Sequence, residues 1–227
     1  MTRFRIPLVA MALASWLGCA TAPVSKDYAR LVAADPRSIL IVPVVNKSVD
    51  VDAAAYFLST IPVPVAERGY YVFPVNMVKR VLEDDGLSDA SLVHQADPAR
   101  LCKLFGADAV LYVTIDRWDA QYMLISTTVT VELDYVLKDG KTGDVLWGTH
   151  EAMRYTPDSG GGGGGLGALI AAAVSAAITK AAPNYIPLAR QANEVAMQYP
   201  GKGFPAGPYR PEYKKDRAPV TGQVPEK

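Results

Sequence analysis

The sequence YMLISTTVTVELDYVL, residues 122–137, decides the fold because apolar and polar side chains alternate along it. Side chains that alternate with a period of two point to opposite faces of a β-strand. The apolar face, which includes one threonine, consists of Met123, Ile125, Thr127, Val129, Val131, Leu133, Tyr135 and Leu137. The polar face consists of Ser126, Thr128, Thr130, Glu132 and Asp134. The pattern predicts a long antiparallel strand with one dry face and one face that is wet or contacts a partner.

Further strands are expected on both sides of this one. ADAVLYVTIDRW, residues 107–118, precedes it, and KDGKTGDVLWGTH, residues 138–150, supplies a hairpin turn and the next strand. The upstream run SILIVPVV, residues 38–45, is continuously apolar, as in a central strand covered on both faces. Pro43 in this run belongs at an edge or a bulge, because proline cannot donate a ladder hydrogen bond. GYYVFP adds a short strand over residues 70–73.

Capping residues, prolines and glycines mark three helices: residues 51–60 after Asp50, residues 75–85 before Gly86, and residues 98–105 between Asp97 and Gly106. In the third helix, Leu101, Leu104 and Phe105 are expected on one side. The order of elements predicts an α/β fold. We expect a mixed sheet with a long antiparallel β-meander, helices packed mainly on one face, and two further helices at the C-terminus.

Six consecutive glycines lead into a run of small and apolar residues in SGGGGGGLGALIAAAVSAAITKAAPNY, residues 159–185. They satisfy G-x-G-x-x-G as any glycine run does, but no acidic residue follows at the required place and no Gly-Lys-Ser/Thr is present, so no nucleotide is expected. Residues 166–182 would form about 25 Å of helix, which is short of a bilayer core of about 30 Å.

This stretch is therefore expected to be a flexible hinge followed by closely packing C-terminal helices over residues 166–199. The hinge is made of Gly160, Gly161, Gly162, Gly163, Gly164 and Gly165. Beyond it, larger apolar side chains recur every four residues between rows of small ones, at Leu166, Ile170, Val174 and Ile178. Such a ridge can pack within its own domain or against a second copy of the chain.

The N-terminus has the features of a secretory signal peptide over residues 1–18. Basic Arg3 and Arg5 precede an apolar run that ends in LGC, with Gly18 immediately before Cys19. This ending resembles the bacterial lipobox, and the resemblance implies cleavage after Gly18 and lipid attachment, including palmitate, at Cys19. Residues 19–37 would then form a lipidated tether, residues 38–199 a single α/β domain, and residues 200–227 a Pro/Gly-rich extended tail. Part of that tail, GPYRPEY, could instead lie along its own domain.

The remaining residues give no sign of catalysis. The chain carries 23 basic and 23 acidic residues, and it has no long basic run that would bind nucleic acid. HExxH, CxxC and G-x-S-x-G motifs are absent, and His150 has no base or nucleophile nearby in sequence. Cys102, among apolar neighbours, is expected to be a buried structural thiol. We expect no enzyme activity, no cofactor and no metal.

Four blocks carry a resemblance to a known family: SILIVPVVNKSVDVDAA, ERGYYVFPV, LFGADAVLYVTIDRW and DGKTGDVLWG. Together they resemble a family of bacterial outer-membrane lipoproteins built on a domain of unknown function. The resemblance implies a fold similar to the periplasmic domains of curli-secretion lipoproteins, of the Tol translocation protein and of lipoprotein activators of cell-wall synthases. None of these modules is an enzyme.

The expected function is therefore a lipid-anchored, periplasmic protein-interaction module at the outer membrane, accessory to envelope assembly, secretion or transport. The resemblance to bacterial lipoproteins implies the outer membrane, because Ala20, and not the aspartate that commonly retains such proteins at the inner membrane, follows Cys19. Its partners would be the bilayer, through acylated Cys19, other envelope proteins, and a second copy in a homo-oligomer. Two alternatives stay open: a subunit of an oligomeric secretion channel, and an activator of a cell-wall synthase.

Overall fold

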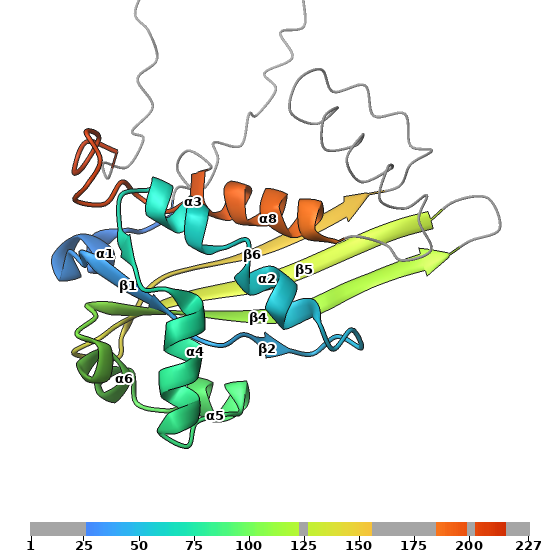
Figure 1. The fold of residues 1–227 in the computed structure, drawn as a ribbon. Helices are drawn as coiled ribbons and strands as arrows, with labels where there is room; N and C mark the ends of the chain where they lie inside the picture. The colour runs from blue at the N-terminus through green and yellow to red at the C-terminus, as the bar shows by residue number, and fades with distance from the viewer. Residues whose placement is uncertain (1–25, 123–126, 156–184, 199–202, 217–227) are drawn as a thin grey trace, which may run out of the picture.

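The computed structural model describes residues 26–122, 127–155, 185–198 and 203–216 (Figure 1). They form one mixed six-stranded sheet with the order β3-β1-β4-β5-β6, in which the short β2 also pairs with β4. The strands are β1 (Ser38–Ile41), β2 (Val45–Asn46), β3 (Tyr71–Val72), β4 (Ala109–Tyr122), β5 (Thr127–Asp139) and β6 (Val145–Tyr155). Strand β1 pairs in parallel with β3 and β4, and β2 pairs in parallel with β4. Strands β4, β5 and β6 form an antiparallel meander. The predicted α/β fold with a mixed sheet and a long meander is confirmed.

The long strand expected over residues 122–137 belongs to two strands of one hairpin. Tyr122 ends β4 and is paired with Thr127, which begins β5, and residues 123–126 between them lie outside the described residues. Alternation continues across this point in the sequence, so the pattern alone does not reveal the reversal. The dry face is as expected, because the five apolar residues that β5 contributes to it are all buried: Val129, Val131, Leu133, Tyr135 and Leu137.

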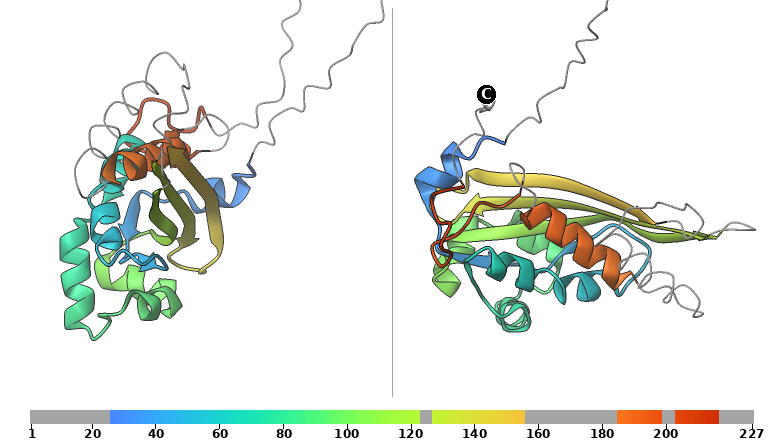
Figure 2. Two further views of the ribbon diagram at one scale, coloured as in Figure 1. Left: turned by 90° about the vertical axis from the view of Figure 1, so that its right-hand side faces the viewer. Right: turned by 90° about the horizontal axis from the view of Figure 1, so that it is seen from above.

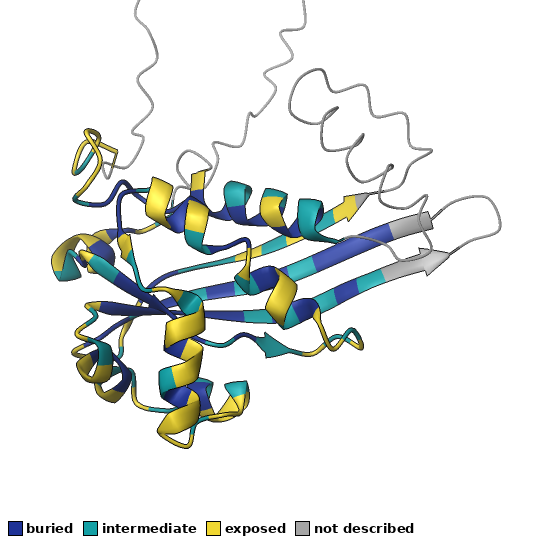
Figure 3. Ribbon diagram, in the orientation of Figure 1, coloured by how far each residue is buried: buried dark blue, intermediate teal, exposed yellow. Residues whose placement is uncertain are grey.

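Helices lie on both faces of the sheet and not mainly on one (Figures 1 and 2). One face carries α2 (Ala53–Leu58), α3 (Pro62–Glu67) and α8 (Ile186–Gln198), and the other carries α4 (Val75–Asp84), α5 (Ala90–Gln95) and α6 (Pro98–Phe105). Consecutive residues of β1 divide between two cores, with Ile39 and Ile41 in the larger and Leu40 in the smaller. Buried residues accordingly concentrate on the strands and on the inner sides of the helices (Figure 3).

The predicted helix boundaries agree well with the structure where local signals were strong. Helix α6 lies between Asp97, whose carboxylate accepts from Ala99 N, and Gly106 in the left-handed conformation. Helix α5 was not expected, and it begins after Asp89, whose side chain accepts two backbone N–H groups. Of the two C-terminal helices expected over residues 166–199, the described residues contain α8, and residues 166–184 lie outside them.

Pro43 splits the expected strand over residues 38–45 into β1 and β2. Both pieces pair with β4, but Ile41 faces Leu111 whereas Val45 faces Thr114. One extra residue therefore lies on the proline side, which is a bulge, as expected from the missing N–H of proline.

A second bulge occurs in β4 at Asp116. Ile115 faces Leu133 and Arg117 faces Glu132, so Asp116 is the extra residue. The last buried residue before the bulge is Ile115, and the next one is Trp118, three positions later and not the two of a regular strand. The bulge thus keeps Trp118 in the core and places Asp116 on the opposite face.

A buried polar chain attaches α8 to the sheet and to the end of α2. The Tyr135 hydroxyl donates to Asn193 Oδ1 at 2.6 Å, and Asn193 Nδ2 donates to Thr60 Oγ1 at 2.8 Å. The Thr60 hydroxyl donates in turn to the Phe57 carbonyl at 2.7 Å. All three polar side chains are buried, and Asn193 is fully so. Because buried polar groups need partners, this chain fixes the position of α8.

Two segments expected to be extended are packed on the domain. The tether predicted over residues 19–37 contains the helix α1 (Ala29–Ala34), whose Leu31 is fully buried. From the predicted tail over residues 200–227, residues 203–216 cross the same end of the molecule. Phe204 inserts between Trp147 and Tyr70, with ring centroids 4.8 and 5.1 Å away. One buried aromatic ring anchors a segment that otherwise lacks an apolar period.

The two segments also contact each other. The Tyr28 hydroxyl donates to the Gly203 carbonyl at 2.7 Å, and Asp35 contacts both Tyr213 and Lys214. We call the surface formed by residues 26–37 and 203–216 the end surface.

Candidate functional site

A cluster of ionisable side chains lies on the outer face of the meander, beyond the part of the sheet that α4, α5 and α6 cover. Its central members come from three neighbouring strands: Asp116 from β4, Asp134 from β5 and His150 from β6. Asp134 is paired with His150 in the β5–β6 register. The bulge in β4 brings Asp116 to the same face.

Short polar contacts connect these side chains and bring in Lys47, which follows β2. Nδ1 of His150 lies 2.7 Å from Oδ1 of Asp134, and Nζ of Lys47 lies 2.7 Å from Oδ1 of Asp116. The side chain of Asp116 is 25% exposed and that of Lys47 is 60% exposed. The cluster is therefore reachable from solvent, and its ion pairs can exchange partners at modest cost.

The electrostatics of the cluster hold Asp116 in its charged form. Burial alone would raise its pKa, but hydrogen bonds with Lys47 and Asp134 and the positive charge of Lys47 outweigh burial and lower the pKa. The hydrogen bond to Asp116 raises the pKa of Lys47 in return. Both partners thus stay ionised at neutral pH.

Asp116, Asp134 and His150 are also the residues in the described part of the chain that could hold a metal ion. Each offers one ligand atom, and these atoms lie within 4.8 Å of one another. Two carboxylate oxygens and an imidazole nitrogen suit first-row divalent metals. However, the ammonium group of Lys47 already neutralises Asp116. Coordination of a metal by Asp116 would therefore require this ion pair to open.

The charged surface continues along β4 and β5 toward the β4–β5 hairpin. Nε of Arg117 lies 3.0 Å from Oδ2 of Asp119, and its Nη1 lies 3.8 Å from Oε1 of Glu132. These side chains are about one third exposed, at 29–33%. We call the whole set the charged face, and it consists of Lys47, Asp116, Arg117, Asp119, Glu132, Asp134 and His150.

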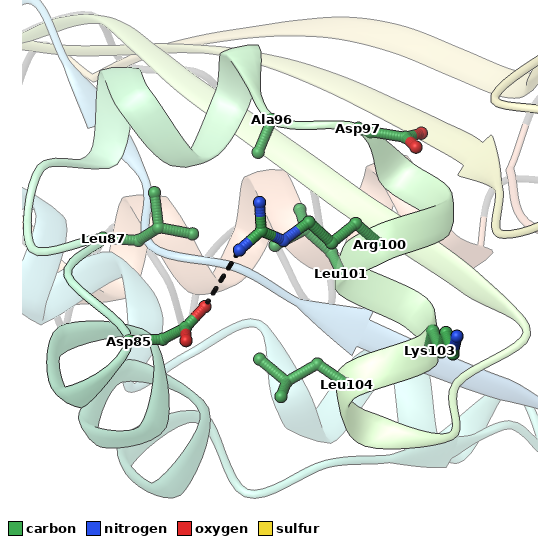
Figure 4. Close-up of a pocket in the computed structure, with 8 residues that line it drawn as sticks. All are labelled: Asp85, Leu87, Ala96, Asp97, Arg100, Leu101, Lys103 and Leu104. Atoms are coloured by element: carbon green, nitrogen blue, oxygen red, sulfur yellow. Dashed lines mark ion pairs between the residues drawn. The ribbon is translucent and has the colours of Figure 1, made fainter.

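A separate pocket of about 600 Å³ lies between the end of α4 and α6 (Figure 4). Its lining residues are Asp85, Leu87, Ala96, Asp97, Arg100, Leu101, Lys103 and Leu104. Arg100 reaches across it to Asp85, with Nη2 3.8 Å from Oδ2 (Figure 4). Leu104 was expected to pack beside Leu101, but it is 47% exposed at the wall of the pocket.

Two further titratable groups serve packing. Cys102 is buried as expected, and burial, with the nearby charges of Asp108 and Asp139, raises its pKa to about 12. Nε2 of His94 donates to the carbonyl of Pro43 at 3.0 Å, and burial lowers the pKa of this histidine. His94 thus connects α5 to the bulge that follows β1.

The site residues singled out in the sequence do not coincide with these features. Cys19, Gly18, the glycines 160–165 and Leu166, Ile170, Val174 and Ile178 all lie outside the described residues. The sequence placed Glu132 and Asp134 on the polar face of one strand, but it did not show which other residues join them in the charged face, because those residues are distant in sequence. His150 has no partner nearby in sequence, and the β5–β6 register alone brings it to Asp134, 16 positions earlier.

None of the described helices combines the length and the apolar character that crossing a bilayer requires. The family described as "Putative lipoprotein GNA1162-like" matches residues 26–209 of the chain. A curated relative from Neisseria meningitidis serogroup B, "Putative lipoprotein NMB1124/NMB1162", is 34% identical over 173 residues, which are 74% of this chain and 80% of the relative.

Solved structures resemble the chain as well. The crystal structure of lipoprotein GNA1162 from Neisseria meningitidis is similar with a TM-score of 0.53 and 34% identity, over 64% of this chain and 100% of that chain. A PelC dodecamer from Paraburkholderia phytofirmans is similar at 13% identity over 75% of this chain and 89% of that chain. Its TM-score of 0.45 is too low to support any statement about assembly.

Proposed function

We propose, since the chain belongs to the GNA1162-like lipoprotein family, that it is a lipid-anchored, periplasmic protein-interaction module at the outer membrane. It acts by binding other envelope proteins, and not by catalysis, in an assembly, secretion or transport complex. Acyl chains on Cys19, including palmitate, provide the attachment. Several chains on this one residue make the anchor durable, because a single acyl chain binds a membrane only weakly.

One observation carries this proposal: among the described residues nothing packs over the charged face, whereas the opposite face of the sheet is covered by helices. The opposite face of the meander is buried under α2, α3 and α8. On the charged face, in contrast, Asp134 and His150 are 46% and 53% exposed and are held in a fixed arrangement by strand pairing. Charges of both signs, at positions that strand pairing fixes, give an interface specificity and orientation.

Site-specific photo-crosslinking in intact envelopes tests the proposal. A benzophenone amino acid placed at Glu132 should give a discrete covalent adduct with another envelope protein, whereas the same group at Tyr56 on α2, a residue that is 42% exposed, should not. Reversing one charge with Asp134→Lys should abolish the adduct at position 132. Adducts of equal yield at both positions, or an adduct that survives the reversal, would contradict the proposal.

The anchor is tested separately by fractionation. Cys19→Ala should release the protein from outer-membrane fractions into the soluble periplasm. Retention of the variant in the membrane would refute lipid attachment at Cys19 without bearing on the charged face.

A further inference from the structure

We propose that the end surface rests against the anionic headgroups of the bilayer in which the chain is anchored, so that the strands of the meander point away from the membrane. The inference rests on the proposed lipid attachment at Cys19. The occupant of this surface is thus a phospholipid bilayer and not a protein.

The length of the chain between anchor and domain gives the first argument. Lys26 already lies on the domain, where its ammonium donates to the carbonyl of Gly148 at 2.7 Å and lies 4.8 Å from the centre of the Trp147 ring. Seven residue steps separate it from Cys19. Even a fully extended chain of this length reaches only about 25 Å. The end surface is therefore held close to the lipid headgroups.

The charge of the end surface gives the second argument. Its two segments carry six basic and four acidic residues, a net charge of +2. The chain from Cys19 onward carries 21 basic and 23 acidic residues, a net charge of −2. Positive charge is therefore concentrated where the anchor is, and the rest of the molecule is negative. Anionic lipids attract such a surface and repel the remainder.

The shape and composition of the surface agree with this role. A hollow of about 370 Å³ opens beside the start of β6, lined by Lys26, Asp27, Arg30 and residues 145–148. Two of its lining side chains are cationic, as phosphate groups require. Tyr209 is 67% exposed in the second segment, and tyrosine is favoured at the headgroup level.

The position of the end surface relative to the sheet sets the orientation. It lies at the end of the meander where β5 finishes and β6 begins, as two views of the ribbon show (Figure 2). From Asp139 back to Thr127, β5 makes 12 residue steps, so the hairpin end lies about 40 Å further out. The charged face between these ends is thereby presented to the periplasm.

Contact quenching in vesicles tests the proposal on the full-length acylated protein. It is reconstituted in vesicles of phosphatidylethanolamine and phosphatidylglycerol (3:1) that contain a lipid with a nitroxide on its headgroup. A fluorophore is attached either at Tyr209→Cys or at Val49→Cys, a residue that is 93% exposed in the loop after β2. Cys102 should not be labelled, because its raised pKa and burial suppress the thiolate.

We expect quenching at position 209 to exceed that at position 49 by about threefold or more, since a headgroup quencher acts only within contact range. The difference should shrink in vesicles of phosphatidylcholine alone, which carry no anionic headgroups. Arg30→Glu with Lys215→Glu should also shrink it. The matched control, Arg80→Glu with Lys103→Glu, makes the same charge change on α4 and α6 and should leave it unchanged.

If the protein floats with the vesicles but both positions are quenched equally, the proposed orientation is wrong and the lipid anchor is not affected. Disulfide formation between two copies of the unlabelled Tyr209→Cys protein, together with no quenching of the labelled one, would overturn the proposed orientation in favour of a self-contact. Absence of flotation would refute the lipid anchor and this proposal together.

Discussion

Replacing Asn193 by leucine would remove the central member of the buried polar chain without leaving a large cavity. The change leaves the Tyr135 hydroxyl as a buried donor without an acceptor, because its 2.6 Å hydrogen bond to Asn193 is lost. Thr60 loses an incoming hydrogen bond but keeps its own bond to the Phe57 carbonyl. Since a buried unpaired polar group costs about 1–3 kcal/mol, we expect a loss of about 2–3 kcal/mol in the free energy of unfolding.

A double-mutant cycle isolates the interaction. Tyr135→Phe leaves the Asn193 oxygen unpaired and should cost about 1–2 kcal/mol. In the double variant both unpaired groups are gone, so the total should fall short of the sum by at least about 1 kcal/mol. Urea unfolding followed by circular dichroism gives the free energies.

Tyr71→Phe is the matched control, because Tyr71 is 52% exposed, and it should stay within about 0.5 kcal/mol of the parent. If Asn193→Leu is neutral, or if the effects of Asn193→Leu and Tyr135→Phe are additive within about 0.5 kcal/mol, the buried polar chain does not hold α8 in place and the reasoning fails.

Three further predictions concern single positions. A maleimide should react with Cys102 only after unfolding. Because the folded pKa of about 12 exceeds the reference value of 9.0, stability should also decline as pH rises above 9. A weaker decline in Cys102→Ala than in the parent between pH 9 and 10, below the reference pKa of 10.0 of the buried tyrosines, would confirm the source. Because burial lowers the pKa of His94, its contribution to stability is present above pH 6.5 and lost as pH falls through the lowered value. His94→Gln should therefore flatten the dependence of the urea midpoint on pH below 6.5, and an unchanged dependence would contradict this. In Gly207→Ala the new methyl group would collide with the Gly69 backbone, so thermal unfolding should show a loss of about 1–3 kcal/mol, and full stability would show that the 203–216 segment is loosely held.

The elements that could be predicted are those whose signals are local. Helix α6 is bounded by Asp97-Pro98 and Gly106, which act through their own backbone conformations, and its ends agree with the prediction. Pro43 likewise predicted an edge or a bulge, of which the structure has the bulge, because a missing N–H affects the ladder wherever proline stands. Alternation of apolar and polar residues predicted the meander because it is also a local signal: successive side chains of a strand point to opposite faces of the sheet.

The features that escaped prediction depend on contacts between distant residues. Phe204 holds a proline-rich segment in place through Trp147 and Tyr70, which precede it by 57 and 134 positions. The Asp116–Asp134–His150 cluster exists because strand pairing places three separate sequence positions side by side. Neither arrangement leaves a pattern within a short window of sequence.

The extra residue at Asp116 also limits how β4 and β5 can align. A regular strand of 14 residues could slide along its neighbour in steps of two, keeping its apolar side inward after each slip. The change of phase between Ile115 and Trp118 removes this freedom, because any slip would move the irregular position away from Glu132 and Leu133 and disrupt the ladder on both sides. The hairpin therefore has a single alignment. A partner that binds across its strands would always meet the same order of charges.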